Sequence, residues 1–152
     1  MGKVSILVNN AGTAVPGSLA EVTNEDFDKQ INLNVRGVFV ASREAAQRME
    51  SGGRIINIGS SLGEAVPMPG LSIYCATKFM LAGLTRGWAR DLGPQNITVN
   101  CIEPGPIDTD SNPADDPQAD YQKSVTALGR YGKPEEVASL VAFVASSEAN
   151  NI

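Results

Sequence analysis

The sequence predicts an α/β fold, in which helices cover both faces of a doubly wound parallel sheet, within a single domain over residues 1–152. Three short, mainly apolar runs predict the strands: Val4–Val8, Ile55–Ile58 and Ile97–Ile102. Each run is followed within two residues by Asn, Gly or Pro, and such runs are typical of strands buried on both faces. Segments of helical length separate the runs, and this alternation implies right-handed crossovers between parallel strands.

The first helical region lies between the first two predicted strands. Thr23 and Asp26 have the spacing of a weak capping box and predict a helix start. Beyond them, apolar and small residues at spacings of three and four predict one buried helix face. They are Val35, Val38, Phe39, Ser42, Ala45, Ala46 and Met49. Gly52 and Gly53 then predict the end of this helix.

A long helix is predicted over Ser72–Leu92, because Gly93-Pro94 is a strong stop signal. Residues 107–121 are rich in Asp, Pro, Ser and Asn and predict a mobile loop with short helical pieces at most. We interpret its acids as solvated loop residues. They are Asp108, Asp110, Asp115, Asp116 and Asp120. Pro134, followed by two glutamates, predicts the start of the last helix.

The composition excludes several classes of partner. The net charge is −5 and no basic cluster is present, so we expect neither nucleic acid nor an anionic membrane surface to be bound. No apolar run approaches the roughly 18 residues of a membrane span. The first residues lead directly into a short strand without a signal-peptide pattern. We therefore expect a cytoplasmic protein.

The chain contains no histidine, which removes Ser-His-Asp hydrolysis and histidine-based metal sites. Its two cysteines, Cys75 and Cys101, have no metal-ligand spacing and suggest reduced thiols in packed positions. We expect no metal site. Tyrosine, lysine and the carboxylates remain as groups for proton transfer.

Tyr74 and Lys78 form the candidate acid–base pair. They are four positions apart (78 − 74 = 4), which places them one turn apart on the same helix face. A nearby ammonium lowers the pKa of a phenol, ordinarily about 10, and such a tyrosine can exchange a proton with a ketone or alcohol oxygen. The hydroxyls of Ser60 and Ser61 can hold the same oxygen. None of these side chains can carry a hydride.

The predicted strand ends place this chemistry in one crevice. Ligands of doubly wound sheets bind beyond the carboxyl ends of the strands. Here those ends are the turn Asn9–Gly12, the turn Gly59–Ser61 and the loop Pro104–Thr109. The candidate pair follows the second of them, so topology and chemistry indicate the same site.

In this order the motifs resemble the short-chain dehydrogenase/reductase family, in the branch similar to 3-oxoacyl-carrier-protein reductases. The resemblance rests on Asn9-Asn10-Ala11-Gly12, Asn34, Ser60, Tyr74, Lys78, the loop Pro104-Gly105-Pro106-Ile107-Asp108-Thr109 and the segment Arg130–Glu136. It implies a Rossmann-like domain that interconverts a ketone and a secondary alcohol with NAD or NADP. It also implies a small-molecule carbonyl or alcohol substrate.

The resemblance assigns four catalytic residues. Tyr74 is the acid–base residue, Lys78 lowers its pKa, Ser60 positions the substrate oxygen and Asn34 completes a proton relay through a water. Ser60 precedes Tyr74 by fourteen positions (74 − 60 = 14), one more than the family's commonest spacing. Ser61 fits when counted back from Tyr74, whereas Ser60 fits when counted from Gly63, and we favour Ser60.

The resemblance also assigns the cofactor contacts. Lys78 holds the nicotinamide ribose, and the turn after the first strand lies beside the adenosine half. The loop after the third strand lies against the nicotinamide. The cofactor-binding residues are Asn10, Ala11, Gly12, Tyr74, Lys78, Pro104, Gly105, Ile107 and Thr109.

The family's glycine-rich phosphate turn has no counterpart in these residues. The match begins at the family's fourth strand and stops before its last strand, so we expect residues 1–152 to form a partial domain, its catalytic portion. Two functions follow: an active oxidoreductase, or an inactive remnant that binds a ligand or another subunit. We expect a homo-oligomer or an association with a full-length homologue. The strand Val4–Val8 would be an open apolar edge, which favours self-association.

Overall fold

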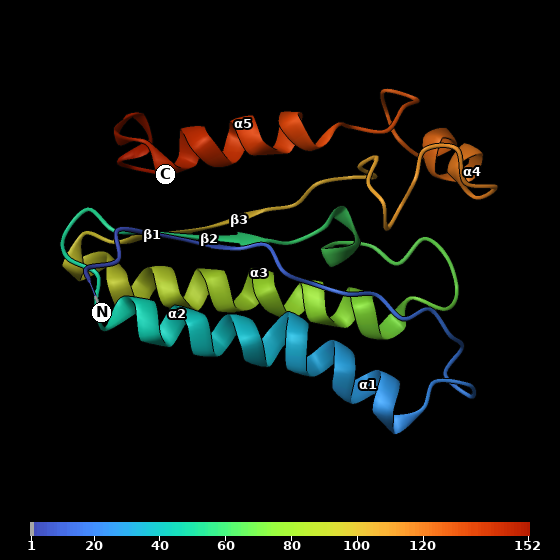
Figure 1. Ribbon diagram of the computed structural model, residues 1–152, viewed down its shortest axis with the longest axis horizontal. Helices are drawn as coiled ribbons and strands as arrows, with labels where there is room; N and C mark the ends of the chain where they lie inside the picture. The colour runs from blue at the N-terminus through green and yellow to red at the C-terminus, as the bar shows by residue number, and fades with distance from the viewer. Residues whose placement is uncertain (1) are drawn as a thin grey trace.

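The structure is a computed structural model, and it describes residues 2–152. It has three layers, with a sheet between helices α1, α2 and α3 on one face and helix α5 on the other (Figure 1). The sheet contains three parallel strands in the order β1 (Ile6–Asn9), β2 (Arg54–Ile58) and β3 (Thr98–Ile102). The predicted α/β class with a parallel sheet is confirmed, and each strand end lies within two residues of its prediction.

Strand β2 is buried on both faces, as its apolar run predicts. Ile55 and Ile56, which point to opposite faces, are both completely inaccessible to solvent. On the side of α2 and α3, Ile55 packs with Met49 and Val99. On the side of α5, Ile56 packs with Val144 and other apolar residues of a second core.

The outer strand β1 is less well covered. Ile6 and Val8 lie opposite Arg54 and Ile56, and they are 49% and 40% exposed. Both belong to the sheet face that α5 covers, but α5 packs against β2 and β3 and does not reach β1. The open apolar edge predicted for this strand is therefore present in the described residues.

The first helical region contains a feature that the sequence pattern did not reveal. Helix α1 (Asn24–Ile31) begins at the predicted capping box, where the Asp26 amide donates to the Thr23 hydroxyl (3.1 Å). A π-helical segment, η1 (Asn32–Gly37), follows it before α2 (Val38–Ala46) continues the same rod. The wider π turn changes which side chains face the sheet, and it places Asn34 in the interior.

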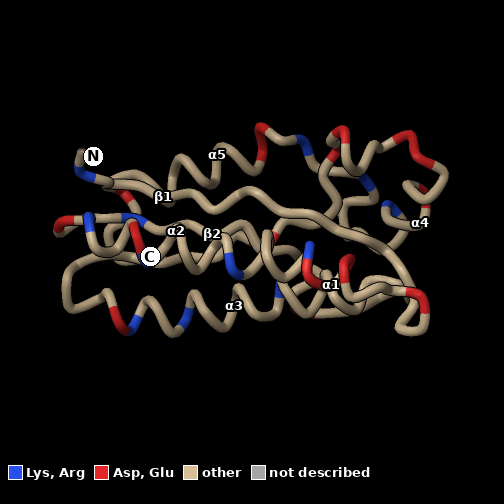
Figure 2. Tube along the Cα trace, turned by 60° about the horizontal axis from the view of Figure 1, so that its bottom comes forward, with Lys and Arg blue, Asp and Glu red and all other residues tan. Residues whose placement is uncertain are grey.

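Helix α3 (Ser72–Leu92) has the predicted bounds; it lies below the sheet and extends beyond the carboxyl ends of the strands (Figure 1). The short helix η3 (Gly93–Gln95) and the left-handed Asn96 (φ 59°) lead from it into β3. One short helix, α4 (Ala119–Ser124), begins within the predicted loop and extends past its end, and acidic residues gather around it (Figure 2). All five of the acids expected in this loop are exposed.

Helix α5 (Pro134–Ala145) begins at Pro134 as predicted, and the short helix η4 (Ser147–Ala149) follows it. Within residues 2–152, no helix combines the length and the apolar character that a membrane crossing needs.

Candidate functional site

The structure brings the three strand ends together. The Gly59 amide, just after β2, donates to the carbonyl of Ile102 at the end of β3 (2.7 Å). The Ser61 amide donates to the carbonyl of Pro104 (2.9 Å), so the second and third strand ends are directly bonded. The short helix η2 (Ser61–Gly63) packs on α3, because a Cβ added to Gly63 would come within 3.2 Å of the Lys78 backbone.

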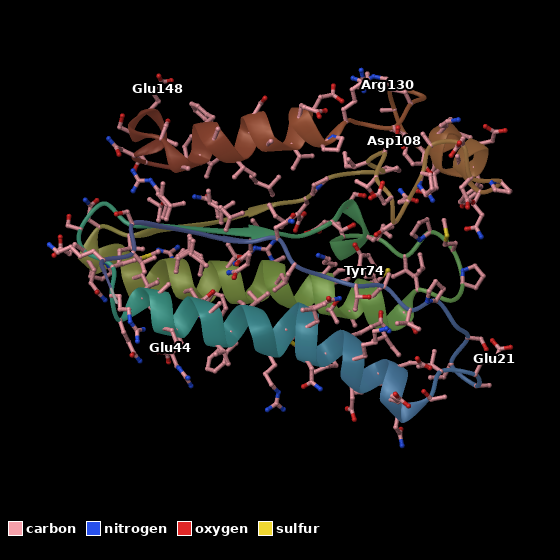
Figure 3. All side chains as sticks on the ribbon, in the orientation of Figure 1. Glu21, Glu44, Tyr74, Asp108, Arg130 and Glu148 are labelled. Carbon is pink, nitrogen blue, oxygen red and sulfur yellow. The ribbon has the colours of Figure 1, made fainter. Side chains whose placement is uncertain are left out.

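Tyr74 and Lys78 lie one turn apart on α3, as their spacing predicts (Figure 3 labels Tyr74). The Lys78 ammonium is 5.6 Å from the centroid of the Tyr74 ring and donates to the Ile58 carbonyl (2.8 Å). Lys78 is 6% exposed, and Tyr74 is partly buried. Since β2 ends at Ile58, this hydrogen bond ties the lysine to the carboxyl end of the central strand.

The expected direction of the Tyr74 pKa is wrong. Burial raises the pKa of Tyr74 above its ordinary value, because it disfavours the charged phenolate, and a hydrogen bond with the Ser60 side chain lowers it only in part. Burial also lowers the pKa of Lys78. The ammonium faces the ring and bonds the Ile58 carbonyl, so it does not offset the desolvation of the hydroxyl. Tyr74 is therefore held as a neutral phenol that can donate a proton.

Ser60 is nearly buried and directs its side chain toward Tyr74. Its backbone is extended (φ −166°, ψ 150°), and its hydroxyl oxygen accepts from the Leu62 amide (3.2 Å), which caps η2. Its proton can therefore be donated to the Tyr74 oxygen, which is the hydrogen bond that lowers the pKa of Tyr74. Ser61 is exposed. This placement supports Ser60 over Ser61 as the partner of Tyr74, and its role stays a prediction.

Asn34 is 1% exposed and fixes the loop after β1. Its Oδ1 accepts from the Thr13 amide (2.8 Å), and its Nδ2 donates to the Thr13 carbonyl (2.8 Å) and to the Thr77 hydroxyl (3.1 Å). Both amide protons are thus committed to the protein. A relay water can reach this side chain only through Oδ1, and that role stays a prediction.

Thr77 is a site residue that the sequence motifs did not reveal. It is completely buried, accepts from Asn34, and donates from its own hydroxyl to the Tyr74 carbonyl (2.7 Å). It therefore connects the π-helical segment to the turn of α3 that carries Tyr74. The available signal was a threonine three positions after the tyrosine, because a helical threonine can bond the carbonyl of the preceding turn.

A second buried network lies one layer below the site. Asn9 and Asn57 are opposite each other on β1 and β2, and Asn9 Nδ2 donates to Asn57 Oδ1 (2.8 Å) and to the Ser42 hydroxyl (3.0 Å). Asn57 Nδ2 donates to the Thr85 hydroxyl (2.9 Å). The first residue of the Asn9–Gly12 turn therefore braces two strands and two helices.

The predicted cofactor contacts follow the ends of β1 and β3. Asn10, Ala11 and Gly12 are exposed at the end of β1, and a Cβ added to Gly12 would lie 3.8 Å from the Lys78 ammonium. The loop from Pro104 to Thr109 continues from β3. These contacts stay predictions.

A groove of about 440 Å³ runs along the outer edge of β3, between that strand and α5. Pro104 and Ile107 line it, together with apolar residues of α5, and Tyr74 and Lys78 do not. It carries no acid–base pair. Among residues 2–152, no group of His, Cys, Asp and Glu side chains is arranged to hold a metal ion.

Comparison with known proteins gives a consistent result. A family model described as "Enoyl-(Acyl carrier protein) reductase" matches residues 1–152. The chain is 47% identical over 149 residues to the cyclic-di-GMP-binding biofilm dispersal mediator protein of Escherichia coli, covering 98% of the chain and 63% of that protein. It is 36% identical to the 3-oxoacyl-[acyl-carrier-protein] reductase of Thermotoga maritima, covering 99% of the chain and 62% of that enzyme.

Solved structures agree. A short-chain dehydrogenase/reductase from Serratia marcescens has a TM-score of 0.97 and 51% identity, and the match covers 99% of the chain and 61% of that structure. A short-chain dehydrogenase from Burkholderia cenocepacia in complex with NADP gives the same four values. The chain thus spans about three fifths of the length of these relatives. It belongs to the short-chain dehydrogenase/reductase family, a family of NAD(P)-dependent oxidoreductases.

Proposed function

We propose that the protein interconverts a ketone and a secondary alcohol with NAD or NADP, and that Tyr74 gives a proton to the ketone oxygen. The observation that carries the proposal is the geometry around Tyr74: a neutral phenol beside the Ser60 hydroxyl, one helical turn from the ammonium of Lys78. A positioned proton donor of this kind typically contributes about 10²–10⁴ in rate.

Each side chain has a separate task in this proposal. Ser60 accepts from the Leu62 amide, which leaves its own proton to be donated, to the Tyr74 oxygen in the free chain and to the substrate oxygen beside Tyr74 in this proposal. Tyr74 supplies the proton as the oxygen gains charge. The bound nicotinamide supplies or accepts the hydride. Asn34 keeps the loop after β1 fixed through its hydrogen bonds with the Thr13 backbone, and it joins this loop to α3 through the Thr77 hydroxyl.

The cofactor fits the free groups of Lys78. Within residues 2–152, the ammonium makes one hydrogen bond, to the Ile58 carbonyl, which leaves two of its three N–H groups for ribose hydroxyls. The exposed turn Asn10–Gly12 would lie beside the adenosine half of the cofactor, and the loop Pro104–Thr109 would lie against the nicotinamide. The complexes of similar proteins with NADP and NADPH support a phosphorylated cofactor.

A second candidate is a protein that binds a ligand or another subunit without turnover. The name of the Escherichia coli relative, a cyclic-di-GMP-binding mediator protein at 47% identity, favours this candidate. A small-molecule partner, a homo-oligomer and a cytoplasmic location stay predictions under both candidates.

Titration of the 152-residue chain with NADPH and NADH, followed by cofactor fluorescence, tests the proposal. We expect saturable binding, and we expect Lys78→Met to weaken it about tenfold or more, because hydrogen bonds from a charged donor are lost. Lys29→Met, a surface variant on α1, is the matched control and should bind as the original chain does. A folded chain that binds neither cofactor would favour the second candidate.

A further inference from the structure

The two outer strands of the sheet each have an open side. Strands β1 and β3 both pair with β2, and among residues 2–152 no further strand pairs with either of them. An outer strand of this kind presents backbone N–H and C=O groups to which another strand can bind. The two open sides differ in the side chains beside them, and the difference makes them complementary.

The open side of β1 has apolar side chains without a cover. Ile6 and Val8 point to the face of the sheet that carries α5, because they lie opposite Arg54 and Ile56 of β2. They are 49% and 40% exposed, since the apolar residues of α5 pack on Ile56 and Ile102 and not on β1. This strand therefore lacks a helix over one of its faces.

The open side of β3 has a cover without a strand beneath it. The groove of about 440 Å³ between β3 and α5 lies on the same face of the sheet. Its lining is mainly apolar, and Leu140 of α5, which borders it, is 47% exposed. The apolar lining residues are Ile102, Pro104, Ile107, Val137, Leu140, Val144 and Ile152. A strand beside β3 would place its side chains on this face against Leu140.

The start of α5, which borders the groove, is held in place. Arg130 donates twice to the Glu136 carboxylate (2.7 and 3.0 Å), and the Lys133 amide donates to the same carboxylate (2.7 Å). Glu136 itself lines the groove. This wall is therefore formed before a partner binds, which reduces the entropy that binding costs.

We propose that β1 of a second copy of the chain pairs with the open side of β3, and that Ile6 and Val8 of that copy enter the groove beside Leu140. All strands of the sheet are parallel, so the added strand would continue the sheet in the same direction. Because side chains alternate between the faces of a strand, Ile6 and Val8 would both lie on the face of α5.

The contact is heterologous, since it joins two different surfaces of the chain and leaves one open side on each copy. Association can therefore continue beyond a dimer. Pairing between two β1 strands, with both α5 helices on one face, would leave Ile6 and Val8 exposed, because α5 packs on β2 and β3 of its own copy. The inference goes beyond the proposed function and needs neither cofactor nor turnover.

Two lysine variants test the two surfaces separately. Val8→Lys places a charge on the side of β1, and Leu140→Lys places one in the groove. Both side chains are partly exposed, so both variants should fold, which circular dichroism checks. In sedimentation velocity, each variant alone should associate about tenfold more weakly than the original chain, or weaker still. Phe143→Lys is the control, because Phe143 is 41% exposed on α5 and does not line the groove.

An equal mixture of the two lysine variants gives the sharpest result. The Val8→Lys chain keeps its groove and the Leu140→Lys chain keeps its β1, so the mixture should form a species of twice the mass of one chain and nothing larger. A mixture that stays monomeric would overturn the proposal. So would an original chain that stays monomeric, or a Leu140→Lys chain that associates as strongly as the original.

Cysteine cross-linking tests the same contact with smaller changes. Val8→Cys chains mixed with Leu140→Cys chains should form disulfide-linked dimers under oxidation, in higher yield than either variant alone. The original chain, with Cys75 and Cys101, gives the background. Equal cross-linking by Val8→Cys alone would indicate pairing between two β1 strands, and no cross-linking above background would show that the groove does not receive β1; either result contradicts the proposal.

Discussion

Replacing Thr77 by valine tests the connection between Asn34 and Tyr74. Valine keeps the shape of threonine but removes the hydroxyl, which accepts from Asn34 Nδ2 (3.1 Å) and donates to the Tyr74 carbonyl (2.7 Å). Asn34 is 1% exposed and Thr77 is completely buried, so we expect no water to replace the Thr77 hydroxyl as the acceptor for Asn34 Nδ2. The variant leaves one buried amide proton unsatisfied and removes two hydrogen bonds.

The expected loss follows from these contacts. A net hydrogen bond contributes about 0.5–1.5 kcal/mol, and a buried donor left without a partner costs about 1–3 kcal/mol. We therefore expect Thr77→Val to lower the free energy of unfolding by about 2–4 kcal/mol, and to lower the Tm by several degrees. Urea and thermal denaturation, followed by circular dichroism, measure both.

Thr98 offers a matched control on β3. Its hydroxyl oxygen is buried, and it has no hydrogen-bond partner within residues 2–152. Thr98→Val removes an unsatisfied polar atom and should leave the chain equally stable or make it more stable. If Thr77→Val changed the free energy of unfolding as little as Thr98→Val, the hydrogen bonds of the Thr77 hydroxyl would not contribute to stability, which would contradict this prediction.

Three further predictions concern the rest of the chain. Gly59→Ala should lower the free energy of unfolding by about 1–3 kcal/mol in urea denaturation, because the new Cβ would lie 2.7 Å from the Cys101 sulfur. Gly83→Ala, on α3, is the control and should be neutral or stabilising, because a Cβ there meets nothing within 4 Å. Equal losses in the two variants would show that close packing at Gly59 does not matter. The charged Glu136 stabilises the folded state above its unfolded pKa of 4.5, and this contribution is lost as the pH falls toward about 2. Glu136→Gln should therefore make the free energy of unfolding depend less on pH between these values in an acid titration. An unchanged pH profile would contradict a stabilising role for the hydrogen bonds from Arg130 and Lys133 to Glu136. The open edge of β1 should make the 152-residue chain self-associate in light scattering, and Val8→Lys should reduce this; a stable monomer would refute the prediction.

The sequence predicted the strands and α3 well because their signals are local. Ile55 and Ile56 belong to a short run rich in β-branched residues that ends at a glycine, which is typical of a strand buried on both faces, and Gly93-Pro94 ends α3 at its predicted stop. Pro134 marks the start of α5 for the same reason: a proline at the first helical position needs no information from the rest of the fold.

The π-helical segment was not predictable from the spacing of apolar residues. The pattern beyond Asn34 fits a uniform helix, and the extra residue per turn is stabilised by hydrogen bonds from Asn34 to Thr13 and Thr77, which come from other parts of the chain. Thr77 was missed because its role depends on the same contacts.

The direction of the Tyr74 pKa shows the limit of spacing arguments. Four positions on a helix correctly placed the ammonium of Lys78 one turn from the ring. The sequence separation does not reveal that burial raises the pKa of the Tyr74 hydroxyl in spite of the nearby ammonium. Nor does it reveal that the Lys78 ammonium donates to the Ile58 carbonyl. Desolvation depends on the loops that cover the site, and these come from distant segments.

Ketone reduction by the chain and by Tyr74→Phe tests whether Tyr74 is the proton donor. With NADPH and a panel of small ketones, we expect measurable turnover that falls about 10²–10⁴-fold in Tyr74→Phe, since phenylalanine keeps the ring and removes the proton. Tyr121→Phe, which removes only a surface hydrogen bond to the Pro67 carbonyl, should retain the original rate. Equal turnover by Tyr74→Phe and the original chain would contradict the assignment of Tyr74 as the proton donor.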